Sequence, residues 1–232
     1  MNLNGNRVTW LGHGTWLWET SDGKRILVDP WLDGNPSCPE HLKKPGRVDT
    51  VLVTHGHGDH VGDIAAGAAG AEAVVAIFET ATLLGGQGVE NVIGMNKGGT
   101  ITVPGATVTM VNAVHSGGMS HEGGFLEAGD PAGFIIRFAD GLCVYQAGDT
   151  DVMMDMQLIG EIDRPDVAVL PIGDVYTMGP SRAAHAVRLL GVKQVFCGHW
   201  GTFPVLVGRP AELQELVGPG VEVANLQPGE SA

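Results

Sequence analysis

The chain has 232 residues, 44% of them hydrophobic, which is enough apolar material for one large domain with a buried core. Its 26 acidic and 13 basic side chains give a formal net charge of −13, which repels polyphosphate backbones and argues against nucleic-acid binding. The 36 glycines are scattered and form no repeat, which excludes collagen-like and low-complexity classes.

The first half of the chain is dominated by short β-type runs. Strands are expected over 7–12, 15–20, 25–30, 48–54 and 73–78, and the run at 48–54 leads directly into the sequence THGHGDH. The Ala-rich segment 59–70 predicts a helix, as does 79–86, which ends at two glycines.

The second half alternates strands with helices. Residues 99–103 and 106–113 predict one hairpin, and 133–147 predicts another with its turn at Ala139-Asp140-Gly141. A strand over 166–173, a helix over 181–190, a strand over 194–199 and a closing helix over 210–217 complete the pattern. Many strands with few helices favour layered α and β (α/β or α+β) in which sheet packs on sheet. No linker interrupts the pattern, so one domain over 1–232 is expected.

The sequence carries no signal for export or membrane insertion. Its N-terminus lacks the apolar region of a secretory signal, and no apolar run approaches the roughly 20 residues that span a bilayer. The three cysteines, Cys38, Cys143 and Cys197, are odd in number and widely spaced, which fits a reducing compartment. We expect a cytoplasmic protein with no membrane partner.

Side chains that bind metals follow several predicted strands at their carboxyl ends. They are His55, His57, Asp59 and His60 after 48–54, His115 after 106–113, Asp149 after the strand that ends near 147, and His199 at the end of 194–199. Strand ends converge on one edge of a sheet, and Gly56 and Gly58 are expected to allow sharp turns between the first four.

The composition and number of these side chains indicate two metal ions. Imidazole and carboxylate ligands without cysteine suit zinc, which is expected here, or alternatively manganese or iron. One structural zinc takes four ligands, so seven candidates favour two divalent ions with open positions. The alternative of an ordinary strand-end histidine is preferred for His13, His41, His121 and His185 taken singly.

THGHGDH matches the H-x-H-x-D-H signature of the metallo-β-lactamase fold. Further matching pieces follow in order: LGHGT at 11–15, LVDPWL at 27–32, DPAGFIIRF at 130–138, QAGDT at 146–150, LPIGDVYTMGP at 170–180 and GHWGTFP at 198–204. From residue 7 to 206 the chain resembles uncharacterised metal-dependent hydrolases related to the ascorbate-6-phosphate lactonases. HWGTFP departs from the HYNTFP that is frequent in that branch, as does the loop after His115, which is less Ser-rich than expected.

The resemblance implies a four-layer αββα sandwich with the site at one edge of the two sheets. By matching position, it implies a first metal on His55, His57 and His115, and a second on Asp59, His60 and His199. Asp149 would bridge the two. A bridging hydroxide would then be the nucleophile, and Asp59 would be the catalytic residue that orients it and accepts its proton.

Five further residues are candidates for the substrate pocket or for contacts to the ligands. His13 either lines the pocket or only has a backbone partner in its turn. Asp29 either accepts a hydrogen bond from a ligand histidine or caps a turn before proline. The resemblance places the loop of Asp174 and Met178 near the site. Trp200, with Trp31 and Phe203, forms either an apolar rim for substrate or core packing.

The leading functional hypothesis is a dinuclear hydrolase acting on a small ester, lactone or phosphorylated metabolite. Its partner is then a small molecule, and an anionic one is compatible because bound cations offset the negative charge. The alternatives are a metal-dependent nuclease or phosphodiesterase of the same fold, an iron-based oxidoreductase, and a non-catalytic metal-binding protein. Self-association is left open.

Overall fold

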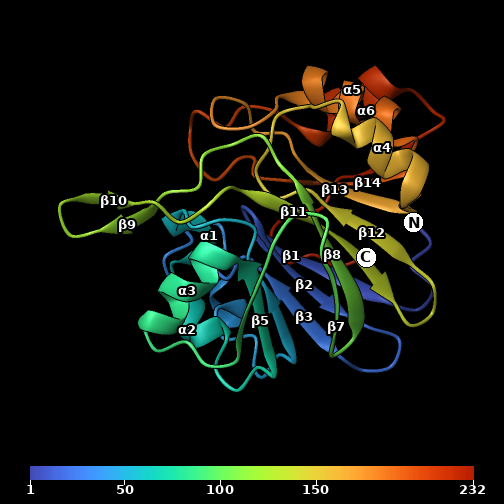
Figure 1. The fold of residues 1–232 in the computed structure, drawn as a ribbon. Coiled ribbons are helices and arrows are strands. Elements are labelled where there is room, and N and C mark those ends of the chain that lie inside the picture. The colour runs from blue at the N-terminus through green and yellow to red at the C-terminus, as the bar shows by residue number, and fades with distance from the viewer.

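Two large β-sheets face each other at the centre of the computed structural model, which describes residues 1–232 (Figure 1). The first has the spatial order β1 (Arg7–Gly12), β2 (Thr15–Glu19), β3 (Arg25–Val28), β4 (Thr50–Leu52), β5 (Ala73–Ile77) and β6 (Val92–Met95). The second has the order β15 (Glu222–Ala224), β14 (Gln194–Gly198), β13 (Val167–Pro171), β12 (Cys143–Gln146), β11 (Ala132–Phe138), β8 (Ala106–Asn112) and β7 (Thr100–Val103).

Helices cover the outer face of each sheet (Figure 1). The first sheet carries α1 (Gly58–Val61), α2 (Ile64–Gly67) and α3 (Phe78–Gly86), and the second carries α4 (Asp155–Ile162), α5 (Pro180–Leu190) and α6 (Pro210–Val217). A short 3₁₀-helix, η1, spans Glu40–Leu42, and a separate hairpin of β9 (Met119–His121) and β10 (Gly124–Leu126) projects from the body. The expected αββα sandwich is therefore confirmed. None of the helices has both the length and the apolar character needed to cross a bilayer.

Alternating side chains build the core on both faces of the first sheet. Trp16 and Trp18 of β2 belong to the large cluster that contains side chains of both sheets, whereas Leu17 between them belongs to the cluster that contains side chains of α1, α2 and α3. In β4, Leu52 likewise belongs to the cluster between the sheets, and its neighbour Val51 belongs to the cluster beneath the helices. Successive side chains of a strand point to opposite faces, so a strand buried on both sides reads as a continuous apolar run.

The strand directions bring the candidate ligands to one edge. In the first sheet β3 and β4 are parallel, and β1 shares their direction because both β1 and β3 pair antiparallel with β2. In the second sheet β12, β13 and β14 are parallel, and β8 shares their direction through antiparallel β11. The carboxyl ends of these strands therefore lie at a common edge of each sheet.

Most expected elements are present, with differences at identifiable residues. The predicted helix over 59–70 is instead two single turns, because Asp63 between them is non-helical and its carboxylate accepts the backbone N–H groups of Leu32 and Gly34. The strand predicted to Phe78 ends at Ile77, and Phe78 begins α3. The hairpin with its turn at 139–141 is confirmed. Helix α4 and strands β6, β9, β10 and β15 were not among the expected elements.

Candidate metal centre

Two clusters of potential metal ligands lie at this edge, and Asp149 stands between them. The first cluster consists of His55, His57 and His115, and the second of His13, Asp59, His60 and His199. A third grouping of His55, His60 and Asp149 joins the two. The structure thus brings together all seven residues that the sequence singled out as ligands, and adds His13.

The distances within the clusters fit coordination of divalent ions. Ligands 2.0–2.1 Å from a tetrahedral ion are separated from one another by about 3.3 Å. His55 Nε2 lies 3.0 Å from His57 Nδ1. Asp149 Oδ2 lies 3.3 Å from His60 Nε2, 3.0 Å from His199 Nε2 and 3.6 Å from His115 Nε2. These separations are those of atoms that share an ion.

Unpartnered nitrogens provide a second test of the fit. The Nε2 atoms of His60 and His199 are buried and lie at ion-pair distance from Asp149 Oδ2, but neither makes a hydrogen bond of good geometry. A buried polar atom without a partner is costly, and an ion between these nitrogens and Asp149 would satisfy them. The donor set therefore fits two divalent metal ions.

Asp29 fixes the tautomers of two candidate ligands. Its Oδ2 accepts a hydrogen bond from His60 Nδ1 (2.8 Å) and one from the Thr54 hydroxyl (2.7 Å). Since Thr54 gives its only proton to Asp29, its oxygen accepts the bond from His55 Nδ1 (3.0 Å). In their neutral forms, both histidines consequently present an unprotonated Nε2 to the centre.

His57 is oriented from the solvent side. Its Nδ1 faces His55, and its Nε2 lies 3.3 Å from the Ser116 hydroxyl, which can accept the Nε2 proton when Nδ1 is unprotonated. His57 would therefore bind a metal through Nδ1, whereas His55 would bind through Nε2.

Strained backbone positions mark the strand ends. His13, Asp29 and His199 follow β1, β3 and β14, and all three have positive φ angles, at 53°, 49° and 54°. This left-handed region is uncommon for residues other than glycine and costs free energy that the surrounding structure must supply. Such strain is concentrated at functional sites, and here it turns each side chain toward the centre.

The two clusters differ in charge state. Burial lowers the pKa values of His55, His57 and His115, so these imidazoles are neutral near pH 7. Burial also disfavours the charged form of His60, but the carboxylates of Asp149 and Asp29 outweigh it and raise the pKa well above its usual value. Burial likewise disfavours the charged form of His199, but the carboxylate of Asp149 outweighs this effect and raises the pKa of His199 to about 9.

The two carboxylates of the clusters are held ionised. Burial opposes the charge of Asp149, yet His199 and His60 keep its pKa well below the usual range. Burial also opposes the charge of Asp59. The hydrogen bond from His13 is the largest of the interactions that lower the pKa of Asp59. Both carboxylates are therefore available as ligands at neutral pH.

Comparison with known proteins agrees with this geometry. Residues 7–199 match the family model described as the beta-lactamase superfamily domain. A protein of Koribacter versatilis called a UPF0173 metal-dependent hydrolase is 45% identical over 232 residues, which are 100% of this chain and 99% of the relative. A protein of the same name from Herpetosiphon aurantiacus is 48% identical, covering 97% and 96% of the two chains. The chain belongs to the UPF0173 metal-dependent hydrolase family.

A solved structure agrees with the fold of this UPF0173 protein. Igni18, described as a novel metallo hydrolase from the archaeon Ignicoccus hospitalis, superposes with a TM-score of 0.84 at 34% identity. The match covers 98% of this chain and 97% of Igni18. The metallo-β-lactamase fold is therefore shown by sequence and by structure.

The glycines of the histidine motif have a different role from the one expected. Neither Gly56 nor Gly58 has a positive φ angle, so neither makes the sharp turn that the sequence argument assumed. A Cβ at Gly56 would lie 3.0 Å from the Gly117 carbonyl oxygen and 3.0 Å from Ala128 Cβ. Gly56 is therefore required for close packing against the loop after His115.

For the remaining pocket candidates the structure shows core packing or local contacts. Met178 is fully buried in the core, and Trp200 stacks on Trp10 with a centroid separation of 5.1 Å. Asp174 is exposed and accepts a hydrogen bond from Val175 within its own loop. His41, His121 and His185 are exposed.

Three hydroxyl residues of the site were not singled out from the sequence. Thr54 and Ser116 contact ligand histidines directly, and the Thr202 hydroxyl lies 2.9 Å from His13 Nδ1. Thr54 and Ser116 each adjoin a candidate ligand in the sequence, and this adjacency was the only available signal. Thr202 is 189 residues from its partner, so no local pattern pointed to it.

Proposed function

We propose that this chain is a dinuclear hydrolase that cleaves a small, uncharged ester or lactone. The observation that carries the proposal is the sharing of Asp149 between two sets of potential ligands, His55, His57 and His115 on one side and Asp59, His60 and His199 on the other. A single structural ion takes four ligands and would leave three of these seven residues unused.

Bound divalent ions would supply a nucleophile at neutral pH, in the form of an acidified bridging water, and would polarise the scissile carbonyl. Zinc suits a centre made of imidazole and carboxylate ligands, and manganese and iron are the alternatives. The three cysteines are buried and free, and none belongs to the ligand clusters.

The chain's own residues orient the reactants. The Asp59 side chain is 31% exposed, whereas Asp149 is 4% exposed, so Asp59 is the carboxylate that faces incoming substrate. We propose that it orients the attacking water and accepts its proton. Asp149, closed off from solvent, holds the two halves of the centre together.

The surroundings favour an uncharged substrate over a phosphorylated one. No lysine or arginine forms a hydrogen bond or ion pair with any of the seven candidate ligands, and the net charge of −13 repels anions. Trp31 and Phe203 lie beside the second cluster, with ring centroids 5.1 and 5.6 Å from that of His13. Both are half-buried and offer an apolar wall to an acyl or alcohol group.

The experiment is a metal analysis of the purified protein followed by a substrate screen. Elemental analysis is expected to give two divalent ions per chain, and turnover is expected with γ- and δ-lactones or aryl esters. Phosphate monoesters and phosphodiesters are the comparison panel. Two ions with preferential phosphodiester cleavage would instead support the nuclease alternative, and two ions with no turnover in either panel would support a binding protein.

A further inference from the structure

His13 occupies the turn between β1 and β2 and is the member of the second cluster that makes a hydrogen bond to Asp59. We propose that His13 is a positioning residue that holds the carboxylate of Asp59 toward the second metal site, with Thr202 fixing the His13 tautomer. The inference rests on the two-metal function proposed above.

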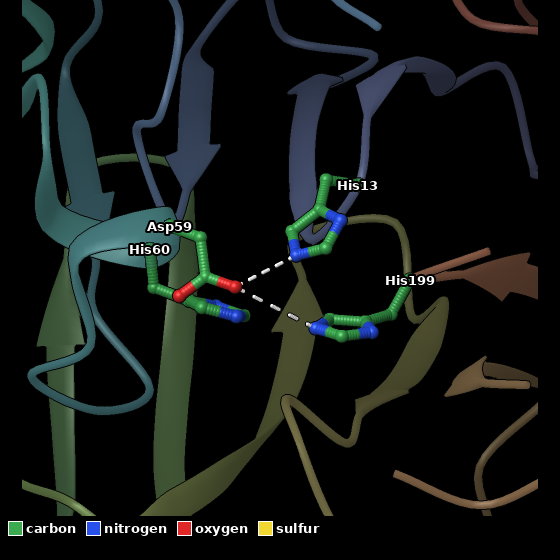
Figure 2. A group of neighbouring side chains, drawn as sticks. All are labelled: His13, Asp59, His60 and His199. Carbon is green, nitrogen blue, oxygen red and sulfur yellow. Dashed lines mark hydrogen bonds and ion pairs between the residues drawn. The ribbon is translucent and has the colours of Figure 1, made fainter. Parts of the chain in front are cut away.

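The hydrogen bonds of His13 define its proton positions. His13 Nε2 lies 2.9 Å from Asp59 Oδ2 (Figure 2), and His13 Nδ1 lies 2.9 Å from the Thr202 hydroxyl. An ionised carboxylate only accepts, so Nε2 carries the proton and donates it to Asp59. Nδ1 of the neutral ring then accepts from Thr202, which selects the tautomer that Asp59 requires.

Asp59 depends on this bond for its orientation. It lies in the single turn of α1, and its side chain is 31% exposed. The bond from His13 is the only hydrogen bond that its carboxylate accepts. The same Oδ2 lies 3.8 Å from His199 Nε2, so the bond from His13 keeps this oxygen directed at the second cluster (Figure 2).

His13 itself is held rigidly. Its side chain is fully buried, with the half-buried rings of Trp31 and Phe203 edge-on to it. Its carbonyl oxygen accepts hydrogen bonds from the backbone N–H of His199 (2.9 Å) and from Trp10 Nε1 (2.9 Å). One residue therefore ties together Asp59 through its ring and His199 through its backbone, although they are 140 positions apart in the chain.

The close approach of the β1–β2 turn to the ligands also requires Gly14. A Cβ at Gly14 would lie 2.6 Å from Cε1 of His60, so any larger residue would displace either that ring or the turn. The His13 turn is thus built against the second cluster.

The geometry argues against His13 as an eighth ligand. The nitrogen nearest the cluster carries a proton donated to Asp59, and the other nitrogen faces Thr202, so neither lone pair is directed at a metal. Asp59, His60, His199 and Asp149 already supply four ligands to the second site.

The test measures the affinity of the full-length protein for each of two Zn²⁺ equivalents by competition with a chromophoric chelator. His13→Gln places an amide nitrogen near the position of Nε2 and retains the donor to Asp59. His13→Asn places its amide near Nδ1 and loses that donor. In His13→Asn, we expect the second equivalent to bind about 10- to 100-fold more weakly, which is the range for loss of a contact to a metal ligand. In His13→Gln, we expect it to bind with close to the wild-type affinity.

The first equivalent serves as an internal control, because His13 contacts none of His55, His57 and His115 through hydrogen bonds. Its affinity is expected to be unchanged in both variants. The Co²⁺-loaded protein gives a spectroscopic readout independent of activity: the absorption of the second site is expected to change in His13→Asn and to be restored in His13→Gln.

Thr202 provides a test that leaves His13 in place. Thr202→Val removes the hydroxyl while keeping the shape, and we expect a roughly two- to tenfold weaker second equivalent, as for loss of one hydrogen bond. Thr202→Ser is expected to restore it.

Equal weakening in His13→Gln and His13→Asn would overturn the inference, because it would mean that the imidazole binds metal or only fills space. Unchanged second-site affinity in Thr202→Val would overturn the role of Thr202. Fewer than two zinc ions on the wild-type protein would instead overturn the proposed function. Circular dichroism of each variant checks that the fold is retained.

Discussion

Asp29 accepts a hydrogen bond from His60 Nδ1 at 2.8 Å, and both side chains are completely buried. The same carboxylate oxygen accepts the Thr54 hydroxyl, which in turn accepts the bond from His55. One carboxylate outside the ligand clusters thereby sets the tautomers of a candidate ligand in each of the two sites.

This relationship predicts different effects for two neighbouring substitutions. Asp29→Asn is expected to weaken both zinc equivalents by about 10- to 100-fold, because it disturbs His60 directly and His55 through Thr54. Thr54→Val is expected to weaken only the first equivalent, which His55 binds. Chelator competition measures both, and Thr54→Ser, which keeps the hydroxyl, is the matched control. Identical profiles for Asp29→Asn and Thr54→Val would contradict the relay.

Asp149 is predicted to control the charge state of His199. Burial alone lowers the pKa of His199, and the charge of Asp149 overrides it to give a value of about 9. In metal-free Asp149→Asn, the pKa of His199 is expected to fall, and both zinc equivalents are expected to weaken because the shared anionic ligand is lost. An NMR titration of the imidazole protons follows the first effect. A His199 pKa that stays near 9 would show that another group maintains it.

The two sites are predicted to differ in proton release. At pH 7.5 the metal-free protein keeps His60 and His199 protonated, since their pKa values are raised, whereas the lowered pKa values of His55, His57 and His115 leave those rings neutral. The second zinc equivalent must therefore displace protons, and the first need not. Titration calorimetry in two buffers of different ionisation enthalpy measures the number of protons released with each zinc equivalent. The affinity of the second site is expected to rise with pH up to about 9, and equal proton release at both sites would contradict the assignment.

The metal-free protein is predicted to be most stable near pH 6.5. The folded pKa of His199, about 9, lies above the unfolded value of about 6.5, so its contribution is complete below pH 6.5 and is lost as the pH rises to 9. Burial lowers the pKa of His13 to about 4, so the unfolded state binds more protons below pH 6.5 and stability also falls on that side. Each such proton changes the free energy of unfolding by about 1.4 kcal/mol per pH unit.

Urea denaturation of chelator-treated protein at pH 5, 6.5 and 9 measures this profile. The midpoint is expected to be highest at pH 6.5. Stability that rises steadily from pH 6.5 to 9 would mean that His199 is neutral in the folded, metal-free protein.

The candidate ligands could be singled out from the sequence because each one follows a hydrophobic strand. Apolar runs such as 48–54 and 194–199 identify buried strands, and a His or Asp at the end of such a run has few structural uses. Since the strands that precede these residues run in one direction within each sheet, their ends coincide, and the structure brings His115 and His199 to the motif of His55 as a consequence.

The rest of the site depends on contacts between distant segments. His13 and Thr202 are 189 residues apart, and neither the Gly-His-Gly turn nor an ordinary threonine indicates a partner. The aromatic rim depends on distant contacts in the same way. Trp200 packs on Trp10 in the core, whereas Trp31 lies beside His13. The sequence alone does not distinguish a tryptophan of the core from one beside the site.

The missed and misread elements have local explanations. Helix α4 has only 8 residues, and it buries Met156 and Ile159 but leaves Leu158 and Ile162 exposed, so its apolar residues do not mark one buried face over several turns. The single helix expected over 59–70 is broken where Asp63 accepts two backbone N–H groups of the 32–34 segment, a contact that spans 31 residues.

Anomalous diffraction from zinc-loaded crystals would locate the metal ions themselves. We expect two peaks about 3.5–4 Å apart, one bound by His55, His57 and His115 and the other by Asp59, His60 and His199, with Asp149 between them. A single peak, or a pair in which Asp149 binds neither ion, would contradict the dinuclear centre.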